Sequence, residues 1–283
     1  MKYIKYLTLC LLMALVASCS DVDVTYQFEE VDNNNKAYVQ IYYVVPLPSV
    51  PANYIYYVDI NGVEHGNDGS TFLATYNFIP SGGVALYYTV DAGDLNIAFK
   101  GKDKVVKYSG TVKDLKPGKH YLAFVYDLTQ EPKLLEAPEV PTFPGTAETA
   151  THCSVRFFNF LYEADGTPFT DKIQYALKNT ETGEYENVGE PVAFGEATSY
   201  FTPTIKKTVF NSKGYQRRDL TLFRIDANTG ENLGQIKYTT VAGKEATFTD
   251  WWTWYIGRAY LQLLSGNRTN KANPMTLKQF GAL

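Results

Sequence analysis

Short runs of alternating apolar and polar residues constrain the fold of this chain more than any other feature. From residue 37 onward these runs are rich in Tyr, Phe, Val and Ile, and clusters of Gly, Pro, Asn and Asp separate them. Runs spaced about eight to twelve residues apart are typical of antiparallel β-sandwiches, so we expect an all-β protein. The expected strands cover residues 37–45, 54–60, 72–78, 84–90, 95–100, 104–112, 120–128, 154–161, 172–177, 206–211, 219–226, 232–239 and 253–264.

A proline-rich segment divides these runs into two sets. Residues 137–151 contain three prolines and one glycine with few aliphatic residues, a composition typical of a stiff linker. We predict two tandem antiparallel β-sandwich domains, immunoglobulin-like or prealbumin-like, at residues 37–136 and 152–283. Residues 179–204 of the second set form a long polar stretch, and loops of this length often carry function.

The first residues have the layout of an export signal. Lys2 and Lys5 precede an apolar run over residues 7–16, and small residues then lead to Cys19. This arrangement resembles the lipobox of bacterial lipoproteins, in which the signal is cut before the cysteine and acyl chains are attached to it. The resemblance implies a signal peptide at residues 1–18 and a membrane anchor on Cys19, with about 0.8 kcal/mol from each buried methylene. An ordinary secretory peptide that happens to contain Cys19 is the alternative.

Residues 19–36 are polar and acidic, which predicts a tether between the lipid and the folded body. Their opening sequence, Ser20-Asp21-Val22-Asp23, is similar to the acidic signal that directs surface lipoproteins of the Bacteroides group to the outer leaflet. The similarity implies an outer-membrane protein exposed at the cell surface. A periplasm-facing position, and an acidity that serves only solubility, are the alternatives.

Charge and cysteine content argue against two classes of site. Removal of residues 1–18 leaves 265 residues and takes two lysines from the 26 basic residues, so 24 basic stand against 30 acidic residues and the formal charge is −6. Such a chain lacks the concentrated basic surface that binds nucleic acid.

The cysteine content argues against disulfides and zinc. Cys10 leaves with the signal and Cys19 carries the lipid, so Cys153 has no partner for an intrachain disulfide or a multi-cysteine zinc site. No other apolar run approaches the roughly 18 residues of a membrane span.

The two sets of runs are similar enough to be two copies of one unit. In each, an aromatic run opens the unit, a Pro- or Gly-bearing loop leads to a second run, and an amphipathic run closes it. The matching pairs of runs are 39–44 with 155–160, 54–59 with 171–176, and 119–126 with 253–260.

This arrangement resembles the bacterial envelope family called domain of unknown function 4397, whose units are small sandwiches that often occur in tandem. Asp114-Leu-Lys-Pro-Gly-Lys-His-Tyr matches the leucine, glycine and tyrosine with which that family enters its last strand. Asn159 matches the Asn that often ends its first strand, and Val44 occupies the equivalent place in the first unit. The resemblance covers about residues 37–136 and 153–265. It implies a structure and no catalytic residue.

Residues suited to nucleophilic catalysis are few. The three histidines, His65, His120 and His152, lie in no motif, and the sequence contains no Gly-x-Ser-x-Gly elbow. Cys153 follows His152 directly, but neighbouring strand residues point to opposite faces of a sheet. We therefore expect Cys153 to be a buried apolar residue rather than the nucleophile of a Cys–His dyad.

Metal and carboxylate sites have equally weak signals. The segment from Asp59 to Glu64 misplaces the glycine and the third ligand of a calcium loop, and its Asn61-Gly62 pair predicts a hairpin instead. We expect no metal, no cofactor and no enzymatic activity. A glycosidase-type carboxylate pair stays open as an alternative, because the separation of two carboxylates is invisible in sequence.

All tryptophans of the chain lie between residues 251 and 254. Alternation along one strand assigns Tyr255 to a uniformly apolar row in the core, while the other row contains Gln262 and is expected to face outward. Outward indoles suit stacking on sugar rings, whereas packing against the other domain or beneath residues 179–204 is the alternative. The outward row supplies the candidate ligand contacts Trp252, Trp254, Arg258 and Tyr260.

These features together predict a lipid-anchored cell-surface protein without catalytic activity, which binds a glycan or a partner protein in an envelope complex. The first alternative is a structural adhesin or fimbria-like subunit, in which the domains are spacers. The second alternative is a glycosidase with an unrecognised carboxylate pair.

Overall fold

The computed structural model describes residues 33–67, 69–81, 86–140, 151–205 and 214–282. In these residues the protein is all-β, as expected, with two short 3-10 turns, η1 (Asn33–Asn35) and η2 (Pro51–Asn53), and no α-helix. The predicted signal peptide, Cys19 and nearly all of the tether lie outside the described residues. The expected strand at 206–211 and most of the predicted linker also lie outside them.

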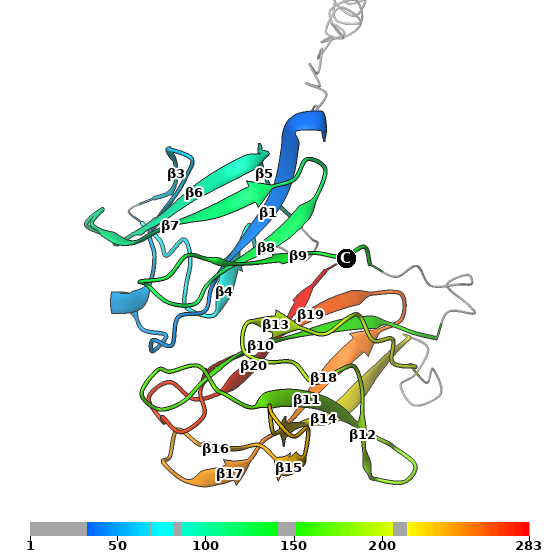
Figure 1. Ribbon diagram of the computed structural model, residues 1–283. Coiled ribbons are helices and arrows are strands. Elements are labelled where there is room, and N and C mark those ends of the chain that lie inside the picture. Colours follow the sequence, from blue (N-terminus) through cyan, green and yellow to red (C-terminus); the bar gives the residue numbers. More distant parts are fainter. Residues whose placement is uncertain (1–32, 68, 82–85, 141–150, 206–213, 283) are drawn as a thin grey trace, which may run out of the picture. The chain divides into compact units, whose positions relative to one another are not determined.

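The strands fall into two sets along the chain, called here the first half (residues 36–136) and the second half (residues 154–281) (Figure 1). The first half contains β1 (Lys36–Tyr43), β2 (Tyr57–Ile60), β3 (Val63–Gly66), β4 (Asn77–Ile79), β5 (Tyr88–Asp91), β6 (Gly93–Lys100), β7 (Val106–Leu115), β8 (His120–Val125) and β9 (Lys133–Glu136). The second half contains β10 (Ser154–Tyr162), β11 (Lys172–Lys178), β12 (Tyr185–Asn187), β13 (Glu196–Ala197), β14 (Tyr215–Ile225), β15 (Asn232–Gln235), β16 (Lys237–Thr239), β17 (Glu245–Thr247), β18 (Thr249–Tyr255), β19 (Ala259–Asn267) and β20 (Thr276–Gly281).

The first half consists of two sheets around one core. One sheet has the order β4-β1-β8-β9, with β5 also paired to β1, and the other has the order β3-β2-β6-β7. Alternate residues of β1, such as Val39 and Ile41, share a core cluster with Val58 of β2 and Ile97 of β6. Because side chains alternate along each strand, each sheet contributes one apolar face to this core.

The Asn61-Gly62 hairpin predicted from the sequence is confirmed and joins β2 to β3. The two turn residues have φ values of 51° and 83°, and positive φ at both central residues is what a type I′ turn requires. The Gly62 amide donates a hydrogen bond to Asp59 Oδ1 at 2.7 Å, and Glu64 Oε2 lies 2.9 Å from Lys100 Nζ. Asp59 and Glu64, the carboxylates on either side of this turn, are therefore bound by the Gly62 amide and by Lys100.

The second half repeats the strand order of the first. Its sheets run β13-β10-β19-β20 and β12-β11-β14-β15, with β18 also paired to β14, while β16 and β17 form a separate hairpin. The stretch 179–204 is therefore not a plain loop, because it supplies β12 and β13. In each half the first strand pairs in parallel with the last strand but one, β1 with β8 and β10 with β19. The other ladders between these strands are antiparallel, as expected.

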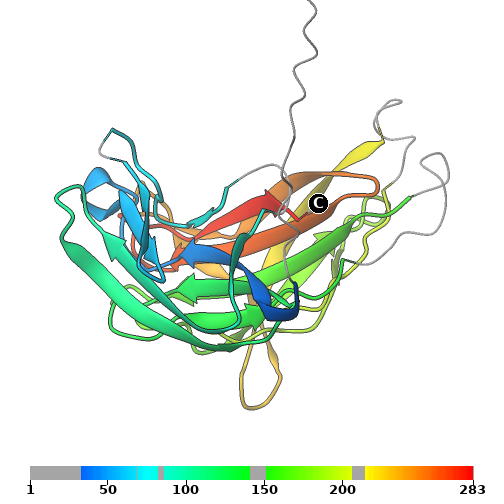
Figure 2. The ribbon, with the colours of Figure 1, turned by 90° about the horizontal axis from the view of Figure 1, so that it is seen from above.

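One sheet of each half packs against the other half, and in Figure 2 the strands of the first half lie over those of the second. The rings of Phe124 and Phe160 stack across this junction with centroids 4.5 Å apart, and Tyr42 stacks on Phe124 at the same distance. The Tyr162 hydroxyl donates a hydrogen bond to the carbonyl oxygen of Tyr126 at 2.8 Å. Because both faces of β10 are covered, all nine of its residues are buried. Contacts join Asn33–Leu283 into one compact unit.

Candidate functional site

The single strand expected over residues 253–264 is two strands in the structure. Strand β18 ends at Tyr255, the chain turns at Ile256 and Gly257, and β19 begins at Ala259. Gly257 has a φ of 72°, a left-handed conformation that glycine adopts without strain. Strands β18 and β19 belong to different sheets, and Trp254 and Tyr260, on either side of the turn, both face the core of the second half. The strand that corresponds to β8 of the first half is β19 rather than residues 253–260.

The expected outward orientation of the tryptophan row is wrong. Trp254 has an exposed fraction of 0% and Tyr260 of 6%, whereas Tyr255, expected in the core, is 39% exposed. The second half has its own core cluster, called here the second core, which includes Val155, Tyr175 and Leu222. Trp252 is half-buried against it, and the indole nitrogen of Trp252 is buried without a hydrogen-bond partner among the described residues. Arg258 is exposed, with its guanidinium carbon 5.1 Å from the centroid of the Tyr255 ring.

A buried chain of polar side chains explains why this row lies inside. The Tyr175 hydroxyl donates to Gln262 Oε1 at 2.7 Å, and Gln262 Nε2 donates to Gln279 Oε1 at 2.9 Å. The Trp254 indole N–H donates to the same Gln279 oxygen at 2.7 Å. Because these polar atoms form hydrogen bonds with one another, Gln262 can be buried without the free-energy cost of an unpaired polar group. A glutamine in this row therefore does not indicate a strand face exposed to solvent.

The opposite face of β18 presents an aromatic surface to solvent. Trp251 is 49% exposed and Tyr255 is 39% exposed. Strand β14 places Tyr215 opposite Tyr255, with ring centroids 5.1 Å apart. It also places Arg217 beside Trp251, with the guanidinium carbon 4.3 Å from the indole centroid. We call Tyr215, Arg217, Trp251 and Tyr255 the aromatic platform.

A polar hollow lies beside the aromatic platform. It has a volume of about 440 Å³, and Arg217 belongs to both. Its lining is made of amide, hydroxyl and charged groups, and Arg217 Nε donates to Asp219 Oδ1 at 2.9 Å. The lining residues are Lys178, Asn179, Thr180, Gly183, Gln216, Arg217 and Asp219. Flat rings beside hydrogen-bonding groups are the two elements that a sugar-binding surface needs.

Tyr215 and Arg217 were not predicted, because their places beside Tyr255 and Trp251 depend on the pairing of β14 with β18, two strands separated by 23 residues of chain. The local signal was present but ambiguous. Tyr215, Arg217 and Asp219 occupy alternate positions of one run, which indicates one shared face without saying which strand lies beside it.

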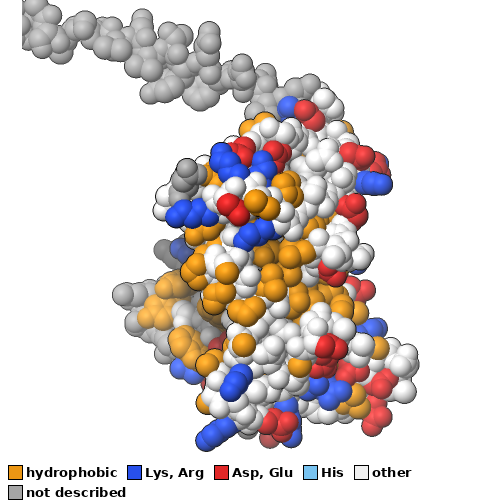
Figure 3. Space-filling view, turned by 90° about the vertical axis from the view of Figure 1, so that its left-hand side faces the viewer, with side chains coloured by type: hydrophobic (Ala, Val, Ile, Leu, Met, Phe, Trp, Pro, Cys, Tyr) orange, Lys and Arg blue, Asp and Glu red, His pale blue; other side chains and the backbone are white. Residues whose placement is uncertain are grey.

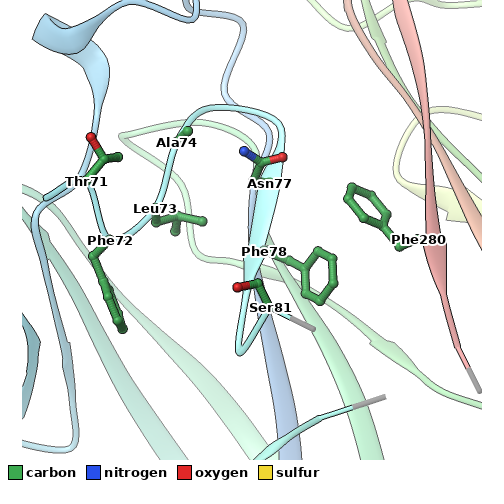
Figure 4. A pocket seen from close by; sticks show the side chains of 8 residues that line it. All are labelled: Thr71, Phe72, Leu73, Ala74, Asn77, Phe78, Ser81 and Phe280. Atoms are coloured by element: carbon green, nitrogen blue, oxygen red, sulfur yellow. The ribbon is translucent and has the colours of Figure 1, made fainter. Parts of the chain in front are cut away.

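A second hollow, of about 460 Å³, lies where β4 of the first half meets β20 of the second. Figure 4 shows Phe78 and Phe280 side by side, and their rings meet edge to face with centroids 4.6 Å apart. Asn77 Oδ1 accepts a hydrogen bond from Lys278 Nζ at 3.1 Å. On the face shown in Figure 3, hydrophobic side chains gather across the middle of the molecule. This hollow is lined by Thr71, Phe72, Leu73, Ala74, Asn77, Phe78, Ser81 and Phe280.

Cys153 is buried, as expected, with an exposed fraction of 0%. Burial raises the pKa of its thiol to about 12, so the nucleophilic thiolate is suppressed at neutral pH. The neighbouring His152 has its Nδ1 3.1 Å from Thr151 Oγ1. Among the described residues no three His, Cys, Asp or Glu side chains are grouped to hold a metal ion. The described residues contain no helix that is long and apolar enough to cross a membrane.

Comparison with known proteins adds little to this description. No protein-family model and no curated protein matches the chain. Among solved structures it is similar to a leucine-rich repeat protein from Bacteroides thetaiotaomicron, with 6% sequence identity and a TM-score of 0.26. The similarity covers 83% of this chain and 26% of the other, so this chain spans about a quarter of that protein's length.

Proposed function

We propose that this chain is a non-catalytic binding protein, anchored to the outer membrane by lipid on Cys19 and contacting a glycan through the aromatic platform. Its body then consists of two tandem β-sandwich domains, as the resemblance to domain of unknown function 4397 implies. The shared strand order of the two halves supports a duplicated unit. The lipobox-like sequence before Cys19 supports the anchor.

The exposure of Trp251 and Tyr255 on one face of β18 carries the proposal. Apolar surface left in water costs about 25 cal/mol per Å², and exposed apolar side chains that gather on one face mark a binding surface. Contacts with Arg217 and Tyr215 hold both rings in place, so little side-chain freedom is lost when a ligand arrives. A sugar ring presents a flat C–H surface that fits such rings, while its hydroxyls can reach the polar hollow beside Arg217.

Affinity electrophoresis through gels containing soluble neutral polysaccharides tests this proposal. The wild-type protein should be retarded by at least one of them, and Trp251→Ala or Tyr255→Ala should weaken that binding about tenfold, because each removes one stacking ring. Val241→Ala is the matched control, since Val241 is also an exposed apolar residue, at 73%, and lies outside the aromatic platform. Equal retardation of wild type and both platform variants would refute a role for this surface.

The anchor has a separate test. Cells fed an alkyne fatty acid should label the wild-type protein, and the Cys19→Ser variant should carry no label, because it lacks the thiol that accepts diacylglycerol. Labelling of both proteins to the same extent would rule out lipidation at Cys19. A Cys10→Ser variant is the control, because Cys10 belongs to the predicted signal peptide.

A partner protein is the second candidate ligand, and the hollow between β4 and β20 is the observation that favours it. Phe72 and Phe280 there are only partly buried, and apolar side chains form most of the lining. Substitution of Phe280 by Ser should abolish capture of a neighbouring envelope protein if this surface is used. The same substitution should leave polysaccharide binding unchanged.

A further inference from the structure

Arg156 of β10 is a charged residue placed deep in the junction between the halves. Its side chain is only 9% exposed. Arg156 Nε donates to the carbonyl oxygen of Thr198 in the second half, and Nη1 donates to that of Glu136 in the first half, both at 3.1 Å. The guanidinium carbon lies 5.0 Å from the centroid of the Phe158 ring. Three neighbours therefore fix the orientation of this cation.

Among the residues that the structure describes, Arg156 has no ion-pair partner of opposite charge. Within the described part of the chain no carboxylate lies in ion-pair contact with it, and its Nη2 has no hydrogen-bond partner. Glu190, a carboxylate whose charge acts on Arg156, instead accepts a hydrogen bond from the Ser199 amide at 2.6 Å. Burial lowers the pKa of Arg156. A buried cation without a counter-ion is costly, and an anionic ligand would remove that cost.

The guanidinium opens into a hollow of about 480 Å³ between the halves. Tyr200 lines this hollow from the second half, and the charge of Arg156 also acts on Tyr42 and Tyr87 of the first half. Burial raises the pKa of all three hydroxyls, and the nearby Arg156 charge acts against that rise in each. Among the described residues the hydroxyls of Tyr87 and Tyr200 have no hydrogen-bond partner, whereas Tyr42 donates to Gln40 Oε1 at 3.1 Å. The Tyr200 phenol and the Arg156 Nη2 group, both from residues that line the hollow, are thus available as donors.

We propose that this hollow binds the carboxylate of an acidic sugar, a uronic acid residue of the glycan. The choice of a sugar rests on the proposed function, and the choice of a carboxylate rests on Arg156. Hydrogen bonds from a cation to a carboxylate are among the strongest in proteins, and the Tyr200 phenol, which lines the same hollow, can donate to the same carboxylate. Glu136 is paired with Lys119 Nζ at 2.7 Å, while the charge of Glu139, which also lines the hollow, disfavours a doubly charged phosphate more than a singly charged carboxylate.

Isothermal titration of the whole protein with methyl glucuronide and methyl glucoside is the first measurement. The two sugars differ only in the carboxylate, so the glucuronide should bind about tenfold more tightly or better. Acetate, which has the charge without the sugar, should bind more weakly than the glucuronide. Equal affinity for the two sugars would overturn the proposal, and acetate that matches the glucuronide would overturn the assignment to a sugar.

Substitutions locate the site and separate it from the aromatic platform. Tyr200→Phe keeps the ring and removes one donor, so it should weaken glucuronide binding about tenfold and leave the unfolding midpoint near that of wild type. Arg156→Lys, checked for folding by circular dichroism, should weaken it further, because the compact ammonium cannot reproduce the fixed fork. Trp251→Ala should change neutral polysaccharide binding but not glucuronide binding. A glucuronide affinity that is the same in wild type, Tyr200→Phe and Arg156→Lys would refute this site. Neutral polysaccharide binding that is unchanged in Trp251→Ala would refute only the proposed function of the aromatic platform.

Discussion

The burial of a polar side chain depends on whether its hydrogen bonds can be completed. Gln262 and Gln279 lie beneath Trp254 because Tyr175 and the Trp254 indole complete their bonds. Composition along one strand does not reveal these partners, since they come from β11 and β20. Trp251 has its guanidinium neighbour on the solvent side, so it stays exposed although it is as apolar as Trp254. For Gln262 and Gln279 the completed hydrogen bonds are what permit a position on the inner face.

Truncation of each tryptophan should therefore have opposite consequences. Trp254→Ala should lower the free energy of unfolding by about 3–5 kcal/mol, because it leaves a cavity in the core of the second half and removes one of the two hydrogen bonds that Gln279 Oε1 accepts. Trp251→Ala should lower it by less than about 1 kcal/mol, because that side chain is half exposed. Urea denaturation of both variants measures the difference. A larger loss for Trp251→Ala would mean that the faces of β18 are interchanged.

Strand positions were largely predictable, and strand partners were not. Alternation located β1, β6, β8, β10, β11 and most of β14, because those runs are long and rich in aromatic and β-branched residues. It missed β9, β12, β13 and β20, which are short or polar edge strands supported mainly by their neighbours. It also joined β18 to β19, since Gly257 is a weak turn signal within an aromatic run. The parallel pairing of β10 with β19 spans most of the second half and has no local signature.

Strand β19 offers a test of its own placement. Gly266 has a φ of 88°, and a β-carbon there would lie only 2.4 Å from the carbonyl oxygen of Pro274. Gly266→Ala should therefore cost about 2–4 kcal/mol, from backbone strain together with this collision. Gly230 has a similar φ of 74° but nothing within 4 Å of a β-carbon, so Gly230→Ala isolates the strain and should cost about 1 kcal/mol. Equal thermal denaturation midpoints for the two variants would contradict the packing of β19 against residue 274.

The two halves are joined by a junction as apolar as a core, and this feature was not predicted. The sequence suggested two domains separated by a linker, and the location of that boundary within residues 137–151 stays a prediction. The sequence of β10 did hold part of the signal, because consecutive apolar residues such as Phe157 and Phe158 occupy both faces, and a strand covered on both faces loses its alternation. Tyr42, Phe124 and Phe160 each look like ordinary core residues of one unit, and their assignment to a shared junction requires the other half to be in place.

Protease nicking in the linker should therefore leave the halves together. After cleavage between residues 137 and 151, the two fragments should co-elute in size-exclusion chromatography. Phe160→Ala, which removes a ring from the junction, should let them separate. Phe157→Ala is the matched control, since Phe157 is also fully buried on β10 but points into the second core. Fragments of the unmodified protein that elute separately would show that the junction alone does not hold the halves.

Buried tyrosines in both halves should make the protein sensitive to alkali. Burial raises the pKa of Tyr43 and of Tyr200 to about 12, against about 10 in an unfolded chain. Their contribution to stability is fully present below pH 10 and is lost as the pH rises toward 12, because the unfolded state releases these protons first. Urea denaturation at pH 8, 10 and 11.5 should show a falling free energy of unfolding. A constant value across this range would contradict the burial of these hydroxyls.

Hydroxyl-radical footprinting read by mass spectrometry tests the aromatic platform most directly, because it reports the exposure of each ring and its protection by a ligand in one experiment. Without ligand, Trp251 and Tyr255 should be oxidised readily and Trp254 hardly at all. A soluble polysaccharide that retards the protein in affinity electrophoresis should then protect Trp251 and Tyr255. Oxidation of Trp254 in place of Trp251, or oxidation of Trp251 that is the same with and without the bound polysaccharide, would contradict the aromatic platform as the glycan-binding surface.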